Sequence, residues 1–165
     1  MKFLPALLAG LMIVGCSNPQ LAVEPAVTIE DPTFAADIRK QLGLADGQPI
    51  LRDAAAKIEK LQLSFGGRLT SQGKTLAGFE QLTGLVELEM NNTEVRDLTP
   101  LTGLPKLKRL NIAFCMEIPK NPGPLLQLKH LEWLHIGYLM VGHEGPDWKT
   151  TIDALRSRGV EIEGP

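Results

Sequence analysis

The side chains that could do catalysis or bind a metal include two cysteines and three histidines. A thiolate at Cys115 could act as a nucleophile if a histidine beside it accepted its proton, but no histidine has a supporting motif around it. His130, His135 and His143 match the spacing of no zinc site, and no cysteine or carboxylate pair completes one. We therefore expect no enzymatic activity, no metal and no other cofactor. Cys115 is interpreted instead as a buried residue at a turn of the fold.

The other cysteine, Cys16, ends a short apolar segment at the start of the chain. Lys2 supplies one positive charge, and residues 3–14 are almost entirely apolar. This length is typical of a signal peptide and too short for a membrane-spanning helix, which needs about 20 residues. Residues 13–16 read Ile-Val-Gly-Cys and resemble the bacterial lipobox. The alternative is an ordinary secretory signal with a cysteine near its cleavage site.

The lipobox resemblance implies a lipid-anchored protein. Cleavage before Cys16 would remove a signal peptide of residues 1–15, and two or more acyl chains on the new terminus would anchor the protein stably. Residues 16–30 contain prolines and no apolar periodicity, so we expect an extended tether there. By the same resemblance, Ser17 favours the outer membrane in a Gram-negative cell. In a Gram-positive cell the protein would lie on the outer face of the plasma membrane.

Composition and charge narrow the range of partners. The chain has 17 basic and 19 acidic residues, for a formal net charge of −2. No basic stripe or cluster stands out, so we expect no binding of nucleic acid. Apolar residues make up 44% of the chain and aromatic residues only 5%. The core is therefore predicted to be aliphatic.

A lattice of leucines supplies that core. The pattern Leu82, Leu85, Leu88 and Met90 recurs in two further coils. The equivalent residues are Leu104, Leu107, Leu110 and Ile112, then Leu128, Leu131, Leu134 and Ile136. Such a period predicts an α/β fold, a short leucine-rich-repeat solenoid in which each coil adds one strand to a parallel sheet. The strands are predicted at 61–63, 88–90, 110–112, 134–136 and 160–162.

Helices are predicted at both ends of the lattice, where a solenoid would otherwise expose its leucines. Asp31 and Pro32 mark a helix start, and Gly43 can end that helix in a left-handed conformation. A second short helix is predicted at 52–57, and a C-terminal helix at 147–158. The folded part is thus divided into an N-terminal cap at 31–60, repeats at 61–145 and a C-terminal cap at 146–165.

The repeats resemble those of the internalins, a bacterial leucine-rich-repeat family. The segments that carry the resemblance are 31–43, 76–85 and 95–101. The last of these reads VRDLTPL and matches the convex half of the repeat, which gives Asp97 a structural role. Residues 65–74 and 116–124 depart from the pattern, and we expect loops or bulges there.

Residues between the leucines of each strand must point to the concave face of the solenoid, because side chains alternate along a strand. We expect two rows there, with two aromatic residues just beyond the strands. These residues are Glu87, Arg109 and Trp133, then Glu89, Asn111 and His135, and finally Phe114 and Tyr138. Arginine and aromatic side chains often carry interface energy, which favours a binding surface. The alternative is that Phe114 and Trp133 pack within the molecule and cover residues 116–124.

These features favour a monomeric, membrane-anchored module of the cell envelope that binds a protein or a glycan on its concave face. Two other functions remain open on the sequence alone. One is a structural or assembly scaffold of the envelope. The other is an immunity or inhibitor protein that acts against a secreted enzyme.

Overall fold

The computed structural model describes residues 25–63, 74–91, 93–115, 119, 121–137 and 146–164. Several sequence predictions lie outside these residues. They concern the signal peptide, Cys16, most of the loop at 65–74, Tyr138 and His143. Within the described residues, no helix is both long enough and apolar enough to cross a membrane.

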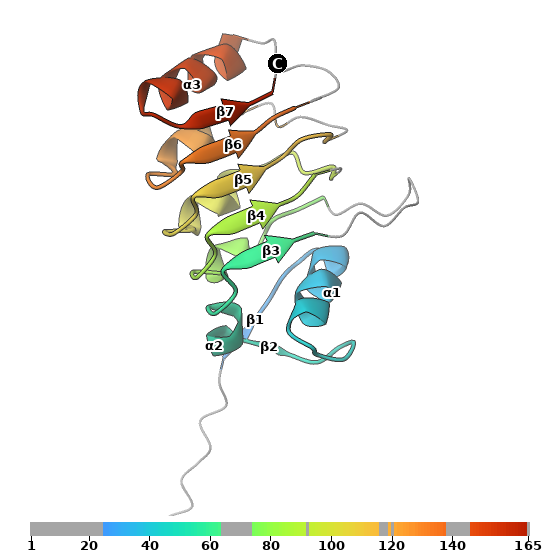
Figure 1. Ribbon diagram of the computed structural model, residues 1–165. Coiled ribbons are helices and arrows are strands. Elements are labelled where there is room, and N and C mark those ends of the chain that lie inside the picture. Colours follow the sequence, from blue (N-terminus) through green and yellow to red (C-terminus); the bar gives the residue numbers. More distant parts are fainter. Residues whose placement is uncertain are drawn as a thin grey trace, which may run out of the picture.

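The centre of the fold is a parallel sheet of five short strands stacked in chain order (Figure 1). The strands are β3 (Lys60–Gln62), β4 (Glu87–Glu89), β5 (Arg109–Asn111), β6 (Trp133–His135) and β7 (Glu161–Glu163). Each lies within one residue of its predicted position. The parallel sheet expected from the leucine lattice is therefore present.

The central leucine of each of the first four strands points into the core. Leu88, Leu110 and Leu134 are partners in the strand register, and none of the three is exposed to solvent. Three short 3₁₀ helices pass behind the sheet, and neighbouring ones pack on each other. They are η1 (Phe79–Gln81), η2 (Thr99–Gly103) and η3 (Gly123–Gln127). Each of the three central coils thus has a strand on one side and a 3₁₀ turn on the other, with leucines filling the space between them.

The turn before β4 shows how closely the coils approach. A Cβ added to Gly84 would lie 1.9 Å from the carbonyl oxygen of Ala56 in the preceding coil. Only glycine fits there without moving the backbone. Gly84 is therefore required by the packing of the coils as well as by the turn.

Helix α1 (Pro32–Gln41) begins where the sequence predicts. A carboxylate oxygen of Asp31 accepts hydrogen bonds from the backbone N–H groups of Thr33 and Phe34, at 2.9 and 3.3 Å. Gly43, just past the helix, has a φ of +68°, the left-handed conformation expected at a helix end. The second helix, α2 (Arg52–Ala55), ends earlier than predicted.

The segment before α1 differs from the prediction. Strand β1 (Ala26–Val27) pairs antiparallel with β2 (Ile50–Leu51), where we expected an extended tether up to residue 30. Val27 and Ile29 are buried in the core. Residues 26–29 therefore belong to the folded domain, because the burial of these two apolar side chains stabilises them there.

Helix α3 (Pro146–Ser157) lies beside β7 at the C-terminal end of the sheet (Figure 1). Trp148, Ile152 and Leu155 are buried and belong to the same core as the leucines. Gly159 follows the helix with a φ of +84°. The helix is thus held to the last coil by one apolar face.

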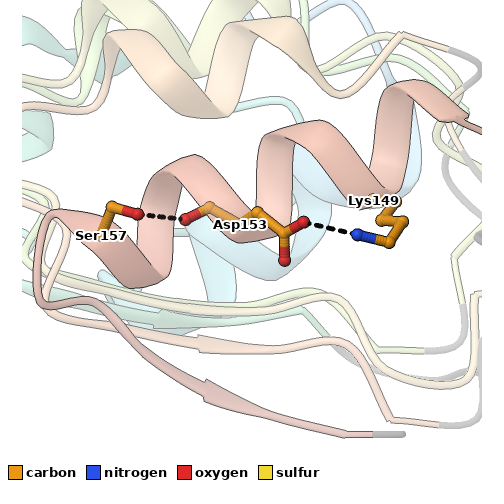
Figure 2. Close-up of polar contacts among 3 residues, drawn as sticks. All are labelled: Lys149, Asp153 and Ser157. Carbon is orange, nitrogen blue, oxygen red and sulfur yellow. Dashed lines mark hydrogen bonds and ion pairs between the residues drawn. The ribbon is translucent and has the colours of Figure 1, made fainter.

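The outer face of α3 is polar (Figure 2). Lys149 Nζ donates to Asp153 Oδ2 at 2.8 Å, and Ser157 Oγ donates to the Asp153 carbonyl oxygen at 2.8 Å. The hydrogen bond from Lys149 lowers the pKa of the Asp153 carboxyl, and the charge of Lys149 adds to the effect. This exposed pair matches the solvent-facing side of an amphipathic helix.

Candidate functional site

The outward-pointing residues of the five strands form two rows across the sheet, on the face opposite the 3₁₀ helices. We call this surface the open face; it corresponds to the concave face expected from the sequence. Its first row is Lys60, Glu87, Arg109, Trp133 and Glu161. Its second row is Gln62, Glu89, Asn111, His135 and Glu163.

The structure extends the predicted rows at both ends. Lys60 and Gln62 were missed at the first strand, and Glu161 and Glu163 at the last. The signal was present in the sequence, because Leu61 and Ile162 occupy the same apolar strand position as the central leucines. The alternation of side chains would have placed their neighbours on the same face.

The centre of the open face is an arginine stacked on a tryptophan. The Cζ atom of Arg109 lies 4.2 Å from the ring centroid of Trp133, the geometry of a cation–π interaction. The two residues meet because they are partners in the register of β5 and β6. Arg109 is exposed and Trp133 half-buried. Such a pair contributes about 0.5–1 kcal/mol at an exposed site, which favours this position of the guanidinium.

His135 extends this cluster into the second row. Its ring centroid lies 5.7 Å from that of Trp133, with the ring planes at 58°. The imidazole lies against Gly137, where an added Cβ would approach Nε2 to 2.5 Å. Arginine, indole and imidazole therefore form one continuous patch on neighbouring strands.

The N-terminal end of the open face is polar and hollowed. Lys60 Nζ and Glu87 Oε2 form an ion pair at 2.9 Å. Beside it lies a cavity of about 320 Å³. Its walls are Gln41, Lys60, Leu61, Gln62, Glu87 and Glu89. The lining is rich in carboxylate and amide groups, which accept hydrogen bonds.

Phe114 and Trp133 were the two aromatic residues that could have packed over the segment at 116–124. Phe114 is 42% exposed and has a φ of +58°, which is uncommon for a residue with a Cβ. Its backbone N–H donates to the Gly137 carbonyl oxygen at 3.1 Å. The described part of the irregular segment at 116–124 is instead contacted by Trp148, whose Nε1 donates to the Pro119 carbonyl oxygen at 2.9 Å.

Cys115 is buried, as interpreted from the sequence. Its side chain is 1% exposed, and Sγ lies 3.5 Å from both Thr93 Oγ1 and the Met90 carbonyl oxygen. Thr93 occupies the equivalent turn in the preceding coil. Its hydroxyl also donates to Met90, at 3.0 Å. Both side chains thus contact the same backbone group, the Met90 carbonyl, where the chain leaves β4.

The remaining candidates for chemistry lie apart. His130 lines a shallow hollow on the turn side with Val86, Pro105, Lys106 and Lys108, whereas His135 lies on the open face. In the described part of the chain, no three residues among the histidines, cysteines and carboxylates are grouped to hold a metal ion.

Asp97 has the structural role expected from the convex repeat. Its Oδ1 accepts a hydrogen bond of 2.8 Å from the backbone N–H of Thr99, at the start of η2. Hydrogen bonds from the hydroxyl and the backbone of Thr99 hold the pKa of the Asp97 carboxyl below its ordinary value. The ionised carboxylate is thus the form that stabilises this turn.

Replacing Asp97 by alanine should lower the free energy of unfolding by about 0.5–1 kcal/mol at neutral pH, as for the loss of an exposed cap. A depressed folded-state pKa gives stability that is present above the unfolded value of about 3.9 and lost as pH falls through the folded value. The difference between wild type and variant should therefore shrink in acid. Urea titrations at a series of pH values measure it, with Asp46→Ala as the control; a difference that grew in acid would contradict this role.

Comparison with known proteins places the fold. No protein-family model and no functionally curated protein matches the sequence. Among solved structures, internalin C2 of Listeria monocytogenes is similar with a TM-score of 0.59 and 22% identity, over 68% of this chain and 49% of that one. Internalin InlF of the same organism is similar with a TM-score of 0.61 and 28% identity, over 71% of this chain and 34% of that one. The fold is a leucine-rich-repeat solenoid.

The internalin resemblance is thus confirmed at the level of the repeat fold. This chain spans less than half the length of either solved internalin chain. The residues that distinguish this chain lie between its leucines.

Proposed function

We propose that this protein is a non-catalytic binding module of the bacterial cell envelope that recognises a protein or a glycan on its open face. The observation that carries the proposal is the exposed cluster of Arg109, Trp133 and His135 at the centre of the sheet. Arginine and tryptophan are enriched among residues that dominate binding energy. The leucines behind them are buried in a single core, so the strands present the cluster in a fixed order to a partner.

The guanidinium of Arg109 supports this role. Its only interaction among the described residues is the stack on Trp133. Among these residues no acceptor takes the N–H donors of the planar group, which makes them available to an acceptor on another molecule. An arginine with a purely structural role would be expected to donate hydrogen bonds to acceptors within the fold.

We also propose that the domain is held at the membrane through lipid on Cys16. Because residues 26–30 belong to the folded domain, the tether reduces to residues 17–24. That length spans about 25–30 Å when fully extended. The open face would then be held close to the membrane surface, in the outer membrane of a Gram-negative cell or on the outer face of a Gram-positive plasma membrane. In this proposal α1 and α3 cap a monomeric solenoid.

Crosslinking in cells tests the proposal. A photo-crosslinking residue replaces His135 on the open face, and a matched control replaces Leu126, which is 39% exposed on η3. We expect a specific crosslinked partner from position 135 and none from position 126. Constant, stoichiometric capture of one envelope component would indicate a scaffold, and capture only in the presence of a secreted enzyme would indicate an inhibitor.

The same partner then permits an affinity test. Arg109→Ala and Trp133→Ala should each weaken binding by more than about 1 kcal/mol, because both side chains belong to the central cluster. Arg52→Ala, which removes an exposed arginine from α2, is the matched control. Thermal melting establishes that each variant is folded. Unchanged affinity in both open-face variants would remove this surface from the binding site.

A further inference from the structure

The charges on the open face point to the chemistry of the partner. We infer that the partner is a protein that lays an extended basic segment across the strands, with two lysine or arginine side chains four positions apart. This inference rests on the proposed function, since it assigns an occupant to the same open face. It follows from three features: the excess of carboxylates, the cavity beside β3, and the spacing of the strands.

The first feature is an excess of carboxylates over cations on the open face. The open face carries four glutamates against Lys60 and Arg109. Lys60 pairs with Glu87, and Arg109 is stacked on Trp133. Among the residues that the structure describes, no cation pairs with the other three, Glu89, Glu161 and Glu163. A partner that covers this face without supplying cations would desolvate carboxylates at a net cost.

The second feature is the cavity at the N-terminal end of the open face. Glu89 lines it together with the amides of Gln41 and Gln62, while Glu87 is held by Lys60. A carboxylate and two amide oxygens offer acceptors to an ammonium or guanidinium group. The hollow of about 320 Å³ leaves room for the stem of a long side chain. One cation of the partner would therefore lie here.

The third feature is the distance between the two acidic ends. Glu89 and Glu163 belong to the same row, three strand steps apart. At about 4.8 Å a step they are separated by about 14 Å. An extended chain rises about 3.3 Å per residue, so side chains four residues apart on one face are separated by about 13 Å. The residue midway between them would pass between Asn111 and His135, beside the ring of Trp133.

The same features disfavour a neutral glycan. Sugars bind tryptophan by stacking on the ring face, and Arg109 covers one face of Trp133. Neutral hydroxyl groups would also leave Glu161 and Glu163 without a counter-charge. A basic polypeptide satisfies both ends of the face and leaves the arginine–tryptophan stack intact.

Titration of the full-length protein with defined probes tests the inference. The probes are a peptide with two lysines at positions i and i+4, an isomer with them at i and i+1, the glutamate counterpart of the first, and a neutral oligosaccharide. Binding is followed through the indole N–H signal of Trp133, assigned by its loss in Trp133→Phe. We expect the first peptide to bind most tightly, with an affinity that falls as salt is raised.

Charge removal locates the two contacts. Glu89→Gln and Glu163→Gln should each weaken the first peptide by about two- to fivefold, the range of an exposed ion pair. The double variant should lose about tenfold, because the two sites are far enough apart to act independently. Glu30→Gln removes an exposed charge from another surface and should leave the affinity unchanged.

Each contrary outcome would overturn a different part of the inference. Equal binding of the two lysine isomers would overturn the spacing, and an unchanged affinity in the double variant would overturn the contacts. Preference for the glutamate peptide or the oligosaccharide would overturn the basic partner while leaving the open face as the binding surface. A partner crosslinked at position 135 that binds without a basic segment would have the same meaning. Failure of the crosslinking experiment itself would instead count against the proposed function.

Discussion

Replacing Leu110 by alanine is expected to lower the free energy of unfolding by about 2–5 kcal/mol. Leu110 is fully buried at the middle of β5, between its register partners Leu88 and Leu134. Removal of its side chain leaves a cavity beside the neighbouring coils, whose strands β4 and β6 are themselves paired with further strands of the sheet. The coils cannot collapse into that space without shifting the strand register. A domain of this size has a stability of about 5–15 kcal/mol, so the variant loses a large share of it.

Thermal and urea unfolding of the full-length protein measure the loss. Leu126→Ala is the matched control, because that leucine is 39% exposed on η3 and should cost little. The Leu110 variant should melt well below both the wild type and the control. An unchanged midpoint would show that Leu110 is not part of the core.

Trp148→Ala is expected to have an effect of similar or larger size, about 3–5 kcal/mol. Trp148 is 2% exposed, and its Nε1 donates to the buried Pro119 carbonyl oxygen at 2.9 Å. The side chain therefore holds α3 to the chain segment that precedes η3. Its removal opens both the apolar contact and the hydrogen bond.

Trp148→Phe separates the two contributions. Phenylalanine keeps most of the apolar contact but leaves the Pro119 carbonyl without its donor, which should cost about 1–3 kcal/mol. If α3 caps the solenoid, the alanine variant should also expose leucines of the last coil and self-associate, as measured by light scattering. A stable and monomeric Trp148→Ala variant would argue against that capping role.

Much of the fold could be predicted because the spacing of the leucines follows the repeat of the coils. The spacing around Leu88, Leu110 and Leu134 predicted the number, order and direction of the strands. A buried strand position tolerates few residue types, so the pattern is visible in one sequence. The N-cap at Asp31 could be predicted equally well, because its hydrogen bonds involve only residues of the first turn of α1.

The pairing of β1 with β2 could not be predicted in the same way. Each strand has two residues, and the paired residues, Ala26 with Leu51 and Val27 with Ile50, are far apart in the sequence. Two residues are too few for an alternating pattern to appear. Burial of Val27 depends on where α1 and α2 come to rest, and this is decided by packing across the whole N-terminal region.

The sequence by itself determined which strand side chains point away from the core and in which order they follow one another across the open face. Strand alternation alone places Arg109 and Trp133 on the face of the sheet opposite the buried leucines. Only the tertiary structure decided that these two stack, that Lys60 neutralises Glu87, and that Glu89 opens onto a cavity. The reason is that contacts between coils join residues far apart in the chain. Their geometry is set by how the coils stack, which no local spacing records.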